Sequence, residues 1–256
     1  MSRPVVEIEG VSKRFAGLTA VDGVDLGVAP GEIRGIVGPN GAGKTTLFNL
    51  ISGLYPVSAG RIRLKGVEIT GQSPHARAAA GLGRTYQTPQ IFPELTLFDN
   101  VAVGLACRRP PTARGAVFGR HAGWRDALRE VADVLGFLRL PTDLALLGGA
   151  LPFGEQKRLE IARALVSGPE VLLLDEPAAG LNRAEIEALM ALIGHIRERG
   201  VTVCLIEHNM RVVMSLCDRI SVLDFGRKIA EGSPDEVRRD PLVIKAYLGT
   251  GADARL

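Results

Sequence analysis

A stretch of nine residues near the N-terminus constrains this chain more than any other feature. It reads Gly38-Pro39-Asn40-Gly41-Ala42-Gly43-Lys44-Thr45-Thr46. The spacing G-x-x-x-x-G-K-[ST] is that of a P-loop, whose glycines let consecutive backbone N–H groups approach phosphate oxygens. Lys44 would add a full charge at the β- and γ-phosphates, and Thr45 a hydroxyl for Mg²⁺. We therefore expect residues 38–46 to bind the phosphates of a nucleotide.

The segments on either side fit a strand that enters this loop and a helix that leaves it. Residues 33–37 read as a short strand. Leu47, Leu50 and Ile51 form an apolar helical face, and Gly53 lies where the helix would end. The helix would point its free N–H groups and partial positive charge at the phosphates. This strand–loop–helix unit predicts an α/β fold.

Length and composition limit the remaining classes of protein. The 256 residues suffice for one large α/β domain, and 46% hydrophobic with 23% charged residues is ordinary for a globular protein. A net charge of +3 gives no argument for a nucleic-acid partner. No signal peptide and no apolar run near the ~20 residues of a membrane helix is found. We expect a cytoplasmic protein with buried, reduced thiols at Cys107, Cys204 and Cys217.

The first part of the chain predicts an antiparallel sheet beside a parallel core. Strands are expected at 5–10 and 24–28, and residues 61–64 and 67–69 form a hairpin pattern. Helical patterns then dominate from about 73 to 151.

Residues 108–123 interrupt this helical stretch. They are basic, irregular and contain glycine, which indicates an exposed connection. Their arginines fit a solvated surface, or contact with a partner or with anionic lipid headgroups. The sequence does not decide between these interpretations.

Continuous apolar runs mark the strands of the second sheet region. Residues 171–174, 201–206 and 219–223 are expected to be strands, the first covered on both faces. Residues 185–199 are amphipathic, and Asn182 precedes them in a capping-box pattern.

Two acidic residues follow the strand expected at 171–174. Asp175 ends that strand, where a carboxylate on the strand neighbouring the P-loop strand would hold Mg²⁺ through water. Glu176 comes next and can project toward the γ-phosphate to polarise the attacking water. Four apolar residues followed by Asp-Glu-Pro indicate a site of nucleotide hydrolysis more specifically than an isolated acidic pair would. The alternative is that the two carboxylates are simply exposed to solvent at the end of a strand.

Three other side chains are candidates for the nucleotide site. If each is considered by itself, a structural role is the simpler interpretation. Gln87 can ligate Mg²⁺ or hold the water, or be a surface amide. His208 can hydrogen-bond the γ-phosphate, or be a structural histidine. Phe15 can stack on adenine, or belong to the core.

A second glycine-containing loop opens a helix. It reads Leu151-Pro152-Phe153-Gly154-Glu155-Gln156. A glycine-containing loop at the start of a helix can bind an anion. This loop has no lysine, and we do not expect it to belong to the nucleotide site formed by residues 38–46. It can act on a nucleotide bound to another subunit, or be an ordinary helix cap.

These segments, in this order, resemble the ATP-binding cassette (ABC) family over nearly the whole chain, about 5–249. The matching positions are Phe15 (A-loop), 38–45 (Walker A), Gln87 (Q-loop), 151–156 (signature), 171–176 (Walker B), Gly180-Leu181-Asn182 (D-loop) and His208 (switch histidine). The resemblance implies a P-loop NTPase fold: a RecA-like core, an antiparallel β-subdomain and an α-helical subdomain within about 73–165. The single ATP-binding domain would span 1–256, with 250–256 as a tail.

The resemblance also implies hydrolysis of ATP with Mg²⁺ in a head-to-tail dimer, where the Walker A loop of one subunit faces the signature of the other. The catalytic residues would be Glu176, His208 and Gln87, and the metal would be held by Thr45, Gln87 and Asp175. The nucleotide would be bound by residues 38–46 and Phe15 and, across the dimer, by Phe153, Gly154, Glu155 and Gln156.

Two positions depart from the family's pattern. The usual signature is L-S-G-G-Q, and Pro152 has neither the hydroxyl nor an N–H with which to replace the serine's bond to the γ-phosphate. One such bond is worth about 1.5–3 kcal/mol. The D-loop has Asn182 where aspartate is usual, which loses a charge and keeps a cap.

The same region narrows the resemblance to the ATPases of branched-chain amino acid importers, as the larger of two paired ATPases. The shared segments are 151–154, 158–165, 176–182, 206–210 and 246–249. Close relatives transport urea, amides and other small solutes. Such a subunit would lie on the cytoplasmic face of the inner membrane, with two permease subunits, a second ATPase (a copy or a paralogue) and, indirectly, a solute-binding protein.

Two other functions remain as alternatives. The ATPase of a lipid or lipopolysaccharide exporter would be expected to keep the serine in the signature. A soluble regulatory or repair ATPase would be expected to carry a second cassette, a coiled coil or a nucleic-acid arm, and none is found. The sequence does not name the solute.

Overall fold

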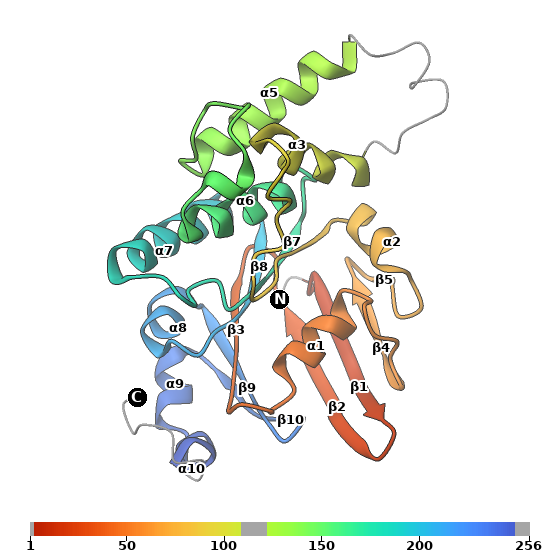
Figure 1. Ribbon diagram of the computed structural model, residues 1–256. Coiled ribbons are helices and arrows are strands. Elements are labelled where there is room, and N and C mark those ends of the chain that lie inside the picture. The colour runs from red at the N-terminus through yellow and green to blue at the C-terminus, as the bar shows by residue number, and fades with distance from the viewer. Residues whose placement is uncertain (1–2, 109–121, 249–256) are drawn as a thin grey trace.

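The computed structural model describes residues 3–108 and 122–248, which form two β-sheets and the helices around them (Figure 1). The strands are β1 (Val6–Phe15), β2 (Leu18–Val28), β3 (Ile33–Val37), β4 (Ala59–Leu64), β5 (Val67–Glu68), β6 (Leu82–Arg84), β7 (Val171–Asp175), β8 (Thr202–Ile206), β9 (Arg219–Asp224) and β10 (Arg227–Gly232). The α-helices are α1 (Lys44–Ile51), α2 (Pro74–Ala79), α3 (Leu97–Ala102), α5 (Ala122–Phe137), α6 (Phe153–Leu165), α7 (Arg183–Glu198), α8 (Met210–Leu216), α9 (Pro234–Arg239) and α10 (Pro241–Leu248). Two 3₁₀ helices are η1 (Val103–Cys107) and η2 (Gly148–Ala150). The predicted tail and most of the predicted basic connection lie outside the described residues.

The larger sheet has six strands in the order β10-β9-β3-β8-β7-β6. Five of them are parallel, and β10 alone is antiparallel to its neighbour β9. Because parallel strands share a direction, β3, β8 and β7 end at one edge of the sheet, and the loops that follow them gather there. The α/β fold predicted from the P-loop is confirmed.

Both faces of this sheet are buried. Leu172 and Leu174 pack in one core with α7, α8 and the helices α3, α5 and α6, whereas Val171 and Leu173 pack in a second core with α1 and the smaller sheet. Alternate residues of a strand point to opposite faces, so an uninterrupted apolar run is what such a strand needs. The prediction of a strand covered on both faces at 171–174 is confirmed.

The smaller sheet is antiparallel, in the order β2-β1-β4-β5, as the hairpin pattern predicts. The expected ends of its strands were wrong: β1 continues to Phe15 and β2 begins at Leu18. Register shifts after Ile8 and Val11 break the alternation of apolar and polar residues. The pairing therefore extends past the point where the sequence pattern is regular.

The stretch from 73 to 165 contains most of the helices that gather at the end of the molecule away from α9 and α10 (Figure 1). It also contributes β6, which pairs with β7 in the larger sheet. Three residues that include a glycine are too short to produce a strand pattern, so this edge strand was missed. Among residues 3–108 and 122–248, no helix has the length and apolarity to cross a membrane.

The three cysteines are free thiols, as expected, but the prediction that all three are buried was wrong for Cys107, which is partly exposed beside a cavity. Cys204 and Cys217 are buried, and burial raises the pKa of each thiol to about 12. A thiol held in its neutral form is a poor nucleophile, so these two side chains act as small apolar groups in the core.

Candidate functional site

The P-loop joins β3 to α1 and is held in one shape by its neighbours. A Cβ at Gly38 would lie 2.0 Å from the carbonyl oxygen of Leu223, and one at Gly43 would lie 2.4 Å from that of Ala20. Both glycines also have positive φ, 148° and 97°. At Gly41, by contrast, a Cβ would meet nothing within 4 Å. The loop is therefore packed tightly on its protein side and open on the other, as a cradle for phosphates requires.

Lys44 lies at the start of α1 and is nearly buried. Its Nζ donates hydrogen bonds to the carbonyl oxygens of Gly38 (2.7 Å) and Pro39 (2.9 Å). Burial lowers the pKa of Lys44, while the nearby carboxylates of Glu176 and Asp175 act to raise it. Desolvation disfavours the charged ammonium form of Lys44. An anion bound in the loop would stabilise that form by pairing with the ammonium. Thr45, the next residue, is exposed.

Glu176, Gln87 and His208 meet beside the ends of three strands. Gln87 Nε2 donates a hydrogen bond to Glu176 Oε2 (2.7 Å), and His208 Nδ1 lies 3.6 Å from the same oxygen. The three residues follow β7, β6 and β8, respectively. A carboxylate, an amide and an imidazole converge here, although the sequence separates them by up to 121 positions.

Asp175 is the last residue of β7 and its side chain is buried. Burial raises the pKa of its carboxyl group, whereas Arg84 lowers it. We expected Asp175 on the strand beside the P-loop strand, and this was wrong: β8 lies between β3 and β7. The order of strands depends on pairing between distant segments, which the sequence pattern does not contain.

Two residues that the sequence analysis did not select hold the backbone around Glu176. Lys157 Nζ donates a hydrogen bond to the Glu176 carbonyl oxygen (2.9 Å), and Glu207 Oε1 accepts one from the N–H of Ala178 (2.7 Å). Glu176 itself has a φ of 47°, in the left-handed region where a non-glycine residue is strained. These bonds stabilise a turn that aims the Glu176 side chain at Gln87 and His208.

Phe15 lies at the tip of the β1–β2 hairpin and is 39% exposed. Its ring contacts Tyr55 edge-on, with centroids 5.3 Å apart, and Lys13 Nζ lies 4.8 Å from its centroid. The same hairpin reaches the P-loop through Ala20, whose carbonyl crowds Gly43. An accessible ring in this position fits a base-stacking platform better than a core residue.

The segment 151–156 opens α6. Pro152 makes no side-chain cap, but its carbonyl oxygen accepts hydrogen bonds from the N–H groups of Glu155 and Gln156. Phe153 is exposed and packs beside Gly180. Asn182 and Glu185 form the predicted capping box at the start of α7. No hydrogen bond or ion pair recorded in the described part of the chain joins 151–156 to the P-loop.

The C-terminal helix α10 also reaches the P-loop, which sequence analysis did not anticipate. Tyr247 is partly buried. Burial raises the pKa of its hydroxyl, although a hydrogen bond with the backbone of Gly38 acts to lower that pKa. The last described helix therefore packs against the first glycine of the motif.

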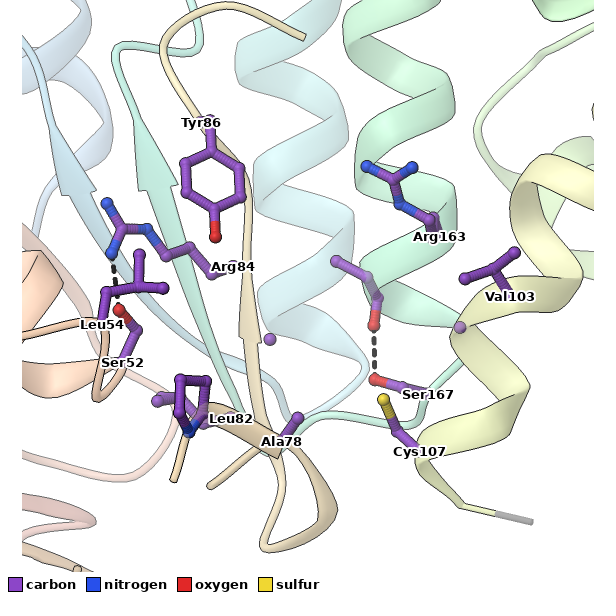
Figure 2. A pocket seen from close by; sticks show the side chains of 14 residues that line it. Ser52, Leu54, Ala78, Leu82, Arg84, Tyr86, Val103, Cys107, Arg163 and Ser167 are labelled. Carbon is purple, nitrogen blue, oxygen red and sulfur yellow. Dashed lines mark hydrogen bonds between the residues drawn. The ribbon is translucent and has the colours of Figure 1, made fainter. Parts of the chain in front are cut away.

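A cavity of about 280 Å³ lies next to this site, between the sheet edge at β6 and the helices α2, η1 and α6 (Figure 2). Its lining includes Leu54, Arg84, Tyr86, Val103 and Arg163. Leu54, Tyr86 and Val103 are exposed apolar or aromatic side chains. Tyr86 immediately precedes Gln87, so the cavity and the polar cluster share one loop.

Two family models match the chain: ABC transporter at residues 21–179, and branched-chain amino acid ATP-binding cassette transporter at residues 227–253. The chain is 44% identical over 253 residues to the high-affinity branched-chain amino acid transport ATP-binding protein BraF of Pseudomonas aeruginosa. It is 40% identical over 261 residues to the corresponding protein LivG of Escherichia coli. Each match covers 97% of this chain and 99% of the relative.

Solved structures agree with the sequence matches. A nucleotide-free ATP-binding cassette from an ABC transporter superposes with a TM-score of 0.84 at 29% identity, covering 95% of this chain and 98% of that one. The ADP conformation of such a cassette gives a TM-score of 0.84 at 30% identity, covering 97% and 100%. The chain belongs to the ABC transporter family. It is an ATP hydrolase of that family, and the resemblance to the branched-chain amino acid group is confirmed.

Lys44 is the most direct test of the P-loop. We expect Lys44→Ala to lower the affinity for ATP tenfold to a hundredfold, because a hydrogen bond between charged groups is worth about 1.5–3 kcal/mol. Titration with a fluorescent ATP analogue measures this. Lys65→Ala is the control, since Lys65 pairs with Glu170 at the opposite end of β7. Unchanged affinity in Lys44→Ala would contradict the assignment.

Proposed function

We propose that this chain is the ATP-hydrolysing subunit of an importer for branched-chain amino acids or related small solutes such as urea and amides. The observation that carries the proposal is the convergence of Gln87, Glu176 and His208 beside a P-loop. The names of the relatives support the solute class.

In this function Glu176 polarises the water that attacks the γ-phosphorus, and the bond to the bridging oxygen breaks to leave ADP and phosphate. Gln87 and His208 flank the same carboxylate oxygen, so they hold Glu176 in place and border the position of the water. Lys44 and the N–H groups of residues 38–46 bind the phosphates, while Phe15 stacks on the base.

The donors at the site fit Mg²⁺. Among the described residues, no group of three or more His, Cys, Asp or Glu side chains could hold a metal ion. Mg²⁺ keeps several waters and takes few protein ligands, so a hydroxyl, a carboxylate and an amide suffice. Thr45, Asp175 and Gln87 would hold it, and the ion would neutralise charge on the phosphates.

The segment 151–156 acts on the nucleotide of a second ATPase subunit, which is a copy of this chain or a paralogue. Phe153, Gly154, Glu155 and Gln156 lie at the start of a 13-residue helix whose N-terminus favours an anion; Phe153 is exposed and the other three are partly exposed. An anion site on this helix, in addition to the P-loop, supports a head-to-tail dimer in which each nucleotide is bound by both subunits.

The cavity between β6 and the helices is the contact for one of two membrane-spanning permease subunits. Its lining includes the exposed side chains of Leu54, Tyr86 and Val103, and it adjoins Gln87 through Tyr86. A permease segment there would hold the subunit at the cytoplasmic face of the inner membrane and connect its movement to the site. A solute-binding protein would act through the permeases, and no nucleic acid takes part.

An exporter ATPase and a non-transport ATPase remain the alternatives. Pro152 argues against the exporter, whose signature is expected to keep serine. The family match at residues 227–253 favours the importer over both alternatives.

Glu176→Gln tests the hydrolytic step. The amide keeps the size of the side chain and loses the charge that polarises water, so we expect turnover to fall at least a hundredfold while ATP binding persists and a closed dimer accumulates. Phosphate release and size-exclusion chromatography with ATP measure these effects. Glu187→Gln, at an exposed ion pair with Arg183 and Arg211, is the control. Unchanged turnover in Glu176→Gln would remove the proposed role.

Pro152→Ser tests the unusual signature. The N-terminus of α6 favours an anion even without the serine hydroxyl, so we expect turnover to stay within about twofold of the parent chain, while serine adds about 0.5–2 kcal/mol of stability as an N-cap. Pro152→Ala separates loss of proline from gain of the hydroxyl. A rise of tenfold or more in Pro152→Ser alone would mean that the missing hydrogen bond limits this ATPase.

A further inference from the structure

Arg84 is a buried arginine at the end of β6 whose partners include the acidic residue of the proposed metal site. Its Nη2 lies 3.4 Å from Asp175 Oδ2, and both side chains are buried, at 7% and 3% exposure. Arg84 pairs with Leu173 in the parallel ladder. Asp175 is two residues beyond Leu173, so it projects from the same face of the sheet. The pairing of β6 with β7 therefore sets this contact.

We propose that Arg84 is a positioning residue that orients the Asp175 carboxylate toward Mg²⁺. The inference rests on the proposed role of Asp175. In the described part of the chain, the side-chain hydrogen bond to Asp175 reaches Oδ2 alone. Arg84 thus holds one oxygen of the carboxylate and leaves Oδ1 for the ion or its water.

The guanidinium is itself fixed from three sides. Its Nη1 donates a hydrogen bond to Ser52 Oγ (2.6 Å), and Ser52 Oγ in turn donates to the carbonyl oxygen of Phe48 in α1. The guanidinium carbon lies 4.8 Å from the Tyr86 ring centroid and 6.0 Å from that of Phe48. Figure 2 shows Arg84 directed at Ser52 with the Tyr86 ring beside it. A side chain held this firmly can fix the direction of its partner.

Two observations separate this role from simple filling of the core. The Arg84 Nε is buried without a hydrogen-bond partner, which is a cost that an apolar side chain would avoid. A buried ion pair is also, on balance, weak evidence for stability, because desolvation of both charges opposes their attraction. The arrangement is therefore better explained by a need to keep the Asp175 carboxylate charged and in a fixed direction.

Arg84 also contacts both Asp175 and the cavity. With Ser52 and Tyr86 it forms part of the cavity wall (Figure 2). A group that enters the cavity and displaces the guanidinium would therefore release Asp175. The Asp175 carboxylate is therefore connected to the proposed permease contact through a single side chain, that of Arg84.

The test compares the affinity for ATP in Mg²⁺ with that in EDTA, measured by titration of the full chain with a fluorescent ATP analogue. Removing a group that orients a metal-binding side chain costs 10- to 100-fold in metal affinity. We expect Arg84→Met to lower the ratio of the two affinities about tenfold, with little change in EDTA. Arg84→Lys keeps the charge, lacks the fork that reaches both Ser52 and Asp175, and should give an intermediate ratio.

A double-mutant cycle shows whether Arg84 acts through Asp175. In an Asp175→Asn background, Arg84→Met should change the ratio no further. Arg63→Met, which removes a partly exposed arginine paired with Glu7 and Glu9, is the control and should leave the ratio at the parent value. Thermal unfolding checks each variant, and Arg84→Lys carries the test if Arg84→Met does not fold.

Two results would overturn the inference alone: an unchanged ratio, whether both affinities are kept or fall equally, or a ratio that rises because Arg84 competes with the ion. A parent chain that binds ATP equally well in Mg²⁺ and in EDTA would instead remove the proposed metal role of Asp175, and this inference with it. The two failures are therefore distinguishable.

Discussion

The parallel pairing of β3, β8, β7 and β6 is the constraint on which the site depends. It brings the P-loop, His208, Glu176 and Gln87 to one edge of a sheet, although these segments come from both halves of the chain. Two buried cores hold that sheet from opposite faces. The apolar strands are thus needed for the chemistry as well as for stability, because a shift of register would separate the polar side chains that follow them.

Much of this arrangement could be predicted from local patterns. The P-loop glycines, the apolar run before Asp175 and the capping box at Asn182 each express a physical requirement of the backbone within a few residues. Gln87 and His208 have no such local pattern. They were selected through the order of motifs that the chain shares with its family, and the structure places both beside Glu176.

The remaining features depend on contacts between distant segments. The position of β8 between β3 and β7, the short edge strand β6, and the bonds from Lys157 and Glu207 to the turn at Glu176 follow from how elements pack together. The ion pair of Arg84 with Asp175 joins residues 91 positions apart. A single sequence contains no sign of such pairs, because one arginine in a strand can equally well face solvent.

The central claim is that a motor for transport is built on this edge of the sheet, and ATP turnover tests it most directly. Turnover would be measured for the purified chain alone, and with candidate permease and paralogue subunits in lipid, with and without a solute-loaded binding protein. The account predicts low turnover alone and marked stimulation by the loaded binding protein, whose solute names the substrate. Full turnover by the isolated chain, indifferent to every partner, would contradict it.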